Sequence, residues 1–89
     1  MSRATMMFDL QWALKHLDDL EKFVKMNQAF MAKNSVQRVR ELFETYGRTG
    51  KEILFAKLDQ IEIAINRNED PSSTINTLKS DINTWMRNL

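Results

Sequence analysis

The sequence predicts an all-α fold, a small antiparallel bundle of about four helices that residues 1–89 form as a single domain. Three observations predict it. Apolar residues recur at steps of three and four along most of the chain, as they do on one face of an α-helix. The composition includes only two Gly and one Pro, too few for a turn-rich β fold. The breaks between the periodic segments are short, which favours antiparallel neighbours.

The first and longest predicted helix runs from Thr5 to about Ala32. Thr5 is expected to cap it, because a threonine hydroxyl can accept a hydrogen bond from a free amide of the first turn. Asn27 falls where the apolar stripe requires an apolar residue, so the helix is either continuous through Asn27 or kinked or ended there. The stripe steps by fours and threes through Met6, Leu10, Ala13, Leu17, Leu20, Val24 and Met31.

Capping signals set the boundaries of the next two helices. The second is predicted to begin at Asn34 or Ser35, whose short polar side chains favour the N-cap position. It is predicted to end at Gly47, because glycine adopts the left-handed conformation that stops many helices. The third is predicted to begin at the T-x-x-E capping box formed by Thr49 and Glu52.

The apolar arc of the third predicted helix is unusually wide. Its core stripe is extended by Ile53, Phe55 and Ala64 past half the circumference of the helix. Three neighbours within one short chain cannot cover so wide an arc. We therefore expect a homodimer, since a two-fold dimer is the commonest way to bury such a surplus.

The fourth helix is predicted from Asp70 and Pro71 to the end of the chain. Pro71 is expected at its first helical position, where proline is favoured. Its apolar period is the most regular in the sequence and consists of Ile75, Leu78, Ile82, Trp85 and Leu89. The opposite face of this helix is mostly uncharged Asn, Ser and Thr.

The charge balance and the lack of cysteine limit the partners and the location that we expect for this protein. Thirteen Lys and Arg against twelve Asp and Glu give a formal net charge of +1, so no field of one sign covers the whole molecule. The sequence has no Cys, which suits a reducing compartment, and we expect a cytoplasmic location. It contains neither a signal peptide nor an apolar run long enough to span a membrane. We therefore expect no membrane partner.

The residues of catalysis are missing from the sequence. His16 is the only histidine, and Asp19, one turn further on, could supply a hydrogen bond or half of a metal site. One His and one carboxylate are too few ligands for zinc, which normally has three or four protein ligands. The sequence therefore predicts no enzyme, no bound metal and no cofactor, and gives His16 a structural role.

Two aromatic residues of the first predicted helix are candidates for binding a partner. Phe8 and Trp12 lie four residues apart, so they share one side of the helix, away from the line of Leu10 and Leu17. Either the bundle covers them, or they form an exposed anchor for a partner protein, since aromatic residues dominate interface hot spots. Ile63 poses the same alternative, because it points away from the core stripe of the third helix.

The basic stretch from Lys33 to Lys51 suggests a different function, nucleic-acid binding. The turn between the second and third helices invites a helix-turn-helix interpretation. Against it, Arg38 and Arg40 project to nearly opposite sides of the second helix, and the third helix is mostly apolar or acidic. The candidate nucleic-acid-binding residues are Lys33, Arg38, Arg40, Arg48 and Lys51.

The sequence thus favours a non-enzymatic protein-binding regulator, adaptor or inhibitor that occludes the surface of another protein. Phe8, Trp12 and Ile63 are its predicted contact residues. The alternative is a small nucleic-acid-binding regulator that uses the basic region from Lys33 to Lys51.

Overall fold

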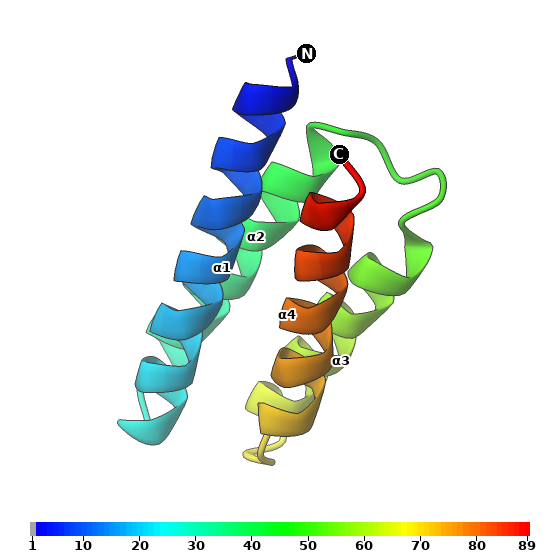
Figure 1. Ribbon diagram of the computed structural model, residues 1–89. Helices are drawn as coiled ribbons and strands as arrows, with labels where there is room; N and C mark the ends of the chain where they lie inside the picture. Colours follow the sequence, from blue (N-terminus) through cyan, green and yellow to red (C-terminus); the bar gives the residue numbers. More distant parts are fainter. Residues whose placement is uncertain (1) are drawn as a thin grey trace.

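Four α-helices alternate in direction along the chain (Figure 1). They are α1 (Arg3–Lys25), α2 (Ala29–Glu44), α3 (Glu52–Asn66) and α4 (Ser72–Arg87) in a computed structural model that describes residues 2–89. Each helix packs on two neighbours, since α1 and α3 both lie against α2 and α4. Both termini and the α2–α3 connection lie at one end of the bundle, and the other two connections at the opposite end (Figure 1). The predicted antiparallel helical bundle is confirmed.

The core lies along the bundle axis and is built from the predicted apolar stripes. Small side chains are also buried, namely Ala13 in α1 and Ala32 and Ser35 in α2. These two helices make the most extensive contact of any pair, as expected where small side chains let helix axes approach. The large, fully buried side chains are Leu10, Leu17, Leu20, Val36, Val39, Phe43, Leu58, Ile61, Ile75, Leu78 and Ile82.

Of the alternatives left open at Asn27, the structure shows that the first helix ends there, and the continuous helix to Ala32 is wrong. Asn27 has φ +56°, a left-handed conformation that stops α1 at Lys25. The amide of Gln28 donates to the carbonyl of Phe23 at 2.9 Å, and the amide of Asn27 donates to that of Val24 at 3.1 Å. This pair of bonds is the Schellman motif. The predicted start of the second helix at Asn34 or Ser35 is therefore also wrong, because α2 begins at Ala29.

The end of α3 repeats this motif at the same end of the bundle. Asn68 also has φ +56°. The amide of Glu69 donates to the carbonyl of Ala64 at 2.8 Å, and the amide of Asn68 donates to that of Ile65 at 3.1 Å. Both helical hairpins, α1–α2 and α3–α4, are thus closed by an asparagine that adopts a conformation usually taken by glycine.

Two predicted caps are displaced along the chain. Ser2, not Thr5, caps α1, and its hydroxyl accepts from the amide of Thr5 at 3.1 Å. The Thr49 capping box does not form, because Lys51 occupies the N-cap of α3 and Glu52 accepts from the amide of Gly50 instead.

Pro71 lies at the N-cap of α4, one residue before the first helical position where it was expected. Just ahead of it, Asp70 accepts from both the amide and the hydroxyl of Ser72. Gly47 adopts the predicted left-handed conformation, with φ +78°, but α2 ends before it, at Glu44.

Polar contacts join each pair of neighbouring helices. The hydroxyl of Tyr46 donates to Asp9 and links α2 to α1. Burial and this hydrogen bond raise the pKa of Tyr46 to about 12. The ammonium of Lys79 in α4 pairs with Asp18 and Glu21 of α1. Further ion pairs join α2 to α3 through Arg40, and α3 to α4 through Lys57 and Asp81.

The left-handed Asn27 yields a prediction on stability. Replacing it with Ala should lower the free energy of unfolding by about 1 kcal/mol, because a Cβ-bearing side chain without a local hydrogen-bonding group is disfavoured there. Asn76, exposed in the middle of α4, is the matched control. Asn76→Ala should raise the free energy of unfolding by about 0.5 kcal/mol, because alanine is the better helix former. Urea unfolding measures both changes, and equal effects of the two variants would contradict the turn assignment.

Candidate interaction surface

Exposed large apolar side chains are concentrated on one half of the bundle. Of the seven within residues 2–89, five belong to α1, α2 or the turn between them, and the other two, Ile53 and Ile63, belong to α3. A contiguous apolar area on a small protein commonly marks an interaction site. The five on the α1–α2 hairpin are Phe8, Trp12, Met26, Phe30 and Met31.

The aromatic pair Phe8 and Trp12 lies near the N-terminus of α1 and is exposed to solvent. The exposed fraction is 58% for Phe8 and 45% for Trp12. Their rings meet edge to face, with centroids 6.3 Å apart and an interplanar angle of 68°. Together with Gln11 and Lys15 they line an open hollow on the surface. Of the two readings left open by the sequence, core or surface, the structure therefore supports the surface.

The neighbours of α1 explain why this pair stays uncovered. The side of α1 that carries Asp9 faces α2, and the hydroxyl of Tyr46, just after the end of α2, donates a hydrogen bond to Asp9. The side that carries Asp18 and Glu21 faces α4, where Lys79 holds both. Because α2 and α4 lie on these sides and α3 lies across the core, no helix within residues 2–89 covers Phe8 and Trp12.

His16 extends the aromatic row by one helical turn. Its ring centroid lies 5.7 Å from that of Trp12. Burial, followed by the positive charge of Arg38 across the α1–α2 seam, lowers the pKa of His16 below its ordinary value. The imidazole is therefore neutral near pH 7 and adds little charge to the aromatic row.

The suggested pairing of His16 with Asp19 does not form. Asp19 pairs instead with Lys15, at 3.2 Å. Across residues 2–89 no group of three or more His, Cys, Asp or Glu side chains is placed to hold a metal ion.

Ile63 is exposed as well, with an exposed fraction of 48%, but it does not join the aromatic pair. It belongs to α3, which lies diagonally across the bundle from α1 (Figure 1). Ile53, expected to extend the core arc of α3, is 69% exposed. The three predicted contact residues therefore form one pair and one separate position.

Sequence reasoning missed the apolar tip of the α1–α2 hairpin. Phe30 is the most exposed large apolar residue, at 74%, and Met26 is 57% exposed. In one continuous first helix Phe30 would follow the half-buried Phe23 by two turns, on the same side. The break at Asn27 changes the phase of the helix and turns Phe30 outward. Asn27, an asparagine in an apolar register, was the signal for this change.

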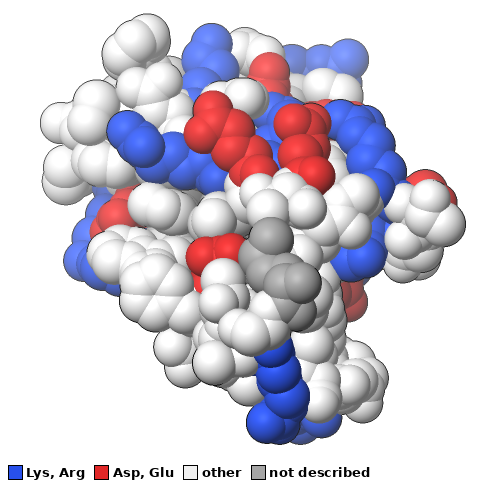
Figure 2. All heavy atoms as spheres, turned by 90° about the horizontal axis from the view of Figure 1, so that it is seen from above, with Lys and Arg blue, Asp and Glu red and all other residues white. Residues whose placement is uncertain are grey.

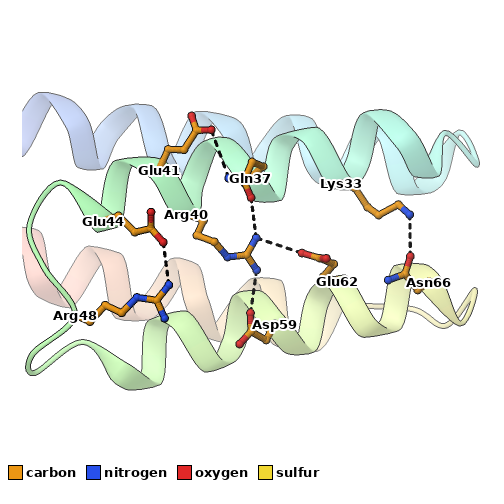
Figure 3. Close-up of polar contacts among 9 residues, drawn as sticks. All are labelled: Lys33, Gln37, Arg40, Glu41, Glu44, Arg48, Asp59, Glu62 and Asn66. Atoms are coloured by element: carbon orange, nitrogen blue, oxygen red, sulfur yellow. Dashed lines mark hydrogen bonds and ion pairs between the residues drawn. The ribbon is translucent and has the colours of Figure 1, made fainter.

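Four of the five candidate nucleic-acid-binding residues contact other side chains of the protein, and the contacts of Lys33, Arg40 and Arg48 are drawn in Figure 3. Lys33 donates to Asn66 at 2.8 Å, and Arg40 pairs with Asp59 at 2.9 Å and Glu62 at 3.2 Å. The guanidinium of Arg40 thus bridges α2 to α3. Its side chain is only 16% exposed, which leaves little of it for a phosphate.

The other basic side chains of this region differ in the partners that they contact. Arg48 pairs with Glu44 at 2.9 Å and lies 4.3 Å over the ring of Phe55. The ammonium of Lys51 lies 5.1 Å from the centre of the Trp85 ring. Arg38 is exposed and has no ion pair within residues 2–89.

Acidic and basic side chains alternate over the end of the bundle that holds the termini and the α2–α3 connection (Figure 2). Neither sign forms a continuous area there. A duplex or single strand binds best to a surface of one positive sign, because its phosphates are closely spaced. This end of the bundle has no such surface.

Comparison with the models of known protein families, with curated proteins and with solved structures found no match to this chain. Within the part of the chain that the structure describes, no helix combines the length and the apolar character required to cross a membrane.

The exposure of Trp12 predicts a contrast between the two tryptophans. Trp12→Ala should lower the free energy of unfolding by only about 1 kcal/mol, as is usual for a surface side chain. Trp85 packs between Phe43 and Tyr46, so Trp85→Ala should cost about 3 kcal/mol. Thermal unfolding followed by circular dichroism compares the two. If Trp12→Ala proves as destabilising as Trp85→Ala, the aromatic pair belongs to the packing.

Proposed function

We propose that this protein is a non-enzymatic, protein-binding regulator, adaptor or inhibitor that acts by occluding a surface of its partner. One observation carries the proposal. The edge-to-face pair of Phe8 and Trp12 is exposed on the side of α1 that is turned away from α2, α4 and the core. The four helices serve as the scaffold, and the outer face of α1 serves as the contact surface.

Phe8 and Trp12 leave apolar area in water, and a partner that covers this area gains binding free energy. Apolar surface contributes about 25 cal/mol per Å² when a partner covers it. Large aromatic side chains lose little conformational freedom on binding, and they dominate the hot spots of interfaces. The two rings of the pair on α1 contact each other edge to face, and a rigid aromatic side chain has few rotatable bonds to order on binding. Ile63 remains a predicted contact only for a partner that reaches α3.

The non-enzymatic part of the proposal has its own support. His16 is stacked on Trp12 rather than paired with a carboxylate or a nucleophile. Most carboxylates are held by a lysine, an arginine or a helix cap, as with Asp81 by Lys57 and Asp70 by Ser72. A general acid requires a buried or strongly perturbed carboxyl group, which ion-paired surface residues do not provide. A cytoplasmic location also remains part of the proposal, on the ground that the chain lacks Cys.

The alternative, a nucleic-acid-binding regulator, has weaker support. Of its five candidate residues only Arg38 is both exposed and without a polar or aromatic partner within residues 2–89. Fluorescence titration of labelled duplex and single-stranded DNA and RNA at two salt concentrations tests it. We expect no binding beyond a weak, salt-sensitive association. Tight binding that Arg38→Glu and Arg40→Glu both weaken would favour the alternative.

Photo-crosslinking tests the leading proposal directly. A photoreactive phenylalanine analogue placed at position 12 should yield a specific adduct with another protein in extracts of the natural host. The same group at Asn76, on the exposed face of α4, should yield none, because that face has no apolar anchor. Phe8→Ala should weaken the captured complex by about 2 kcal/mol in the purified state.

Equal labelling from positions 12 and 76 would contradict the proposal, because the adducts would then reflect chance collisions. So would a purified complex whose affinity is unchanged by Phe8→Ala.

A further inference from the structure

The outer face of α1 carries a second helical stripe that the bundle does not use. Its members recur at steps of four, three, four, three and four, the spacing of a helix-pairing seam. All are exposed or half-buried, on the side of α1 turned away from the core. They are Phe8, Trp12, Lys15, Asp19 and Lys22 of α1, and Met26 at its C-cap.

This stripe is symmetric about position 17. Phe8 and Met26 lie nine residues on either side of that position, and Lys15 and Asp19 lie two residues on either side. At 1.5 Å of rise per residue, Phe8 and Met26 are about 27 Å apart along the helix. When two copies of such a stripe are laid antiparallel, each residue faces its symmetric counterpart on the other copy.

The chemistry of the facing residues is complementary in that register. Phe8 would meet Met26 of the second copy, so apolar surface covers apolar surface. Trp12 would meet Lys22, a pairing that allows a cation–π contact. Lys15 of each copy would meet Asp19 of the other, so two ion pairs form at the centre. Each contact occurs twice, because the arrangement has two-fold symmetry.

The same charges disfavour the other orientation. In a parallel pair of α1 helices Lys15 would face Lys15 and Asp19 would face Asp19, and like charges across a seam are repulsive. The ion pair between Lys15 and Asp19 within one copy is no obstacle, because an exposed pair of this kind contributes only about 0.3 to 0.5 kcal/mol. Lys22 makes no ion pair within residues 2–89 and is available to a second copy.

We infer that a second copy of this chain docks on the outer face of α1, with the two α1 helices antiparallel and crossing near position 17. The inference rests on the proposed function in one respect, since both assign the same face to binding. It adds a regulatory consequence. The dimer covers Phe8 and Trp12, so self-association and binding of another protein exclude each other, and dilution or a strong partner releases the anchors.

This interface differs from the one that the sequence suggested. The sequence placed the surplus apolar surface on the third helix. In α3 the exposed residues Ile53 and Ile63 lie ten residues apart, and the charged side chains between them are engaged in ion pairs with α2 and α4. The α1 stripe has apolar ends and oppositely charged residues at its centre, and charges that pair between helices set the orientation of the two helices.

Charge exchange at the centre of the seam tests the inference. The wild-type chain and the variants Lys15→Asp and Asp19→Lys are examined by sedimentation velocity from about 5 to about 500 µM. The wild-type chain should dimerise within this range. Either variant alone should weaken the dimer at least tenfold, because each places like charges opposite one another twice. An equimolar mixture of the two variants should recover the wild-type affinity, because every facing pair is again of opposite charge.

Arg87→Asp, a matched change of charge on the exposed last turn of α4, is the control and should leave the dimer unchanged. Circular dichroism establishes that each variant keeps its helices. A wild-type chain that stays monomeric at every concentration overturns the inference, as does a mixture that dimerises no better than its components. Either result leaves the proposed function standing if position 12 still crosslinks to another protein. A dimer that forms as predicted, with no such adduct, would instead contradict the proposed function alone.

Discussion

The turn at Asn27 is the constraint on which the rest of the structure depends. A helix that continued past it would place the apolar residues of α2 on the far end of a long rod, with no partner on which to fold. The left-handed asparagine reverses the chain within three residues, Met26 to Gln28, and brings α2 back along α1. Asn68 does the same for α3 and α4 at the same end of the bundle. Two hairpins of matched geometry then share one core.

The surface follows from that reversal. Once α2 lies on one side of α1 and α4 on the other, the ties from Asp9 to Tyr46 and from Lys79 to Asp18 and Glu21 fix the rotation of α1 about its axis. Phe8 and Trp12 are left facing outward. Their exposure is therefore a consequence of the helix packing and not of a loosely built terminus. A natural sequence that keeps two aromatics in water on a rigid helix is typical of an interaction surface.

Much of the fold could be predicted from the sequence because the apolar period reports directly on the buried face. The stripes of the third and fourth helices, such as Leu58, Ile61, Ile75 and Leu78, form the core as expected. Helix boundaries were less predictable. Thr5 and Thr49 match the composition of caps, but Ser2 and Lys51 occupy those positions, since several residues in a row can cap and tertiary packing chooses among them. The outward face of Phe30 depended on the break at Asn27, which local propensity alone left undecided.

The aromatic pair could be located from the sequence, but its exposure could not be derived. Helical spacing placed Phe8 and Trp12 together, while the choice between core and surface required the positions of α2 and α4. In the basic region, the sequence could not show which basic side chains are already paired with acidic ones. The sequence shows Arg40 and Asp59 nineteen residues apart, and only the packing of α2 on α3 brings them into an ion pair.

The exposure of Trp12 in the free monomer is the central claim, and iodide quenching of its fluorescence tests it most directly. In a Trp85→Phe variant at submicromolar concentration, Trp12 is the only source of tryptophan emission. The account predicts strong quenching, within about a factor of two or three of a free indole, because nearly half of the side chain is open to solvent. Emission that iodide scarcely quenches, in a variant that remains helical, would place Trp12 in the packing and contradict the account.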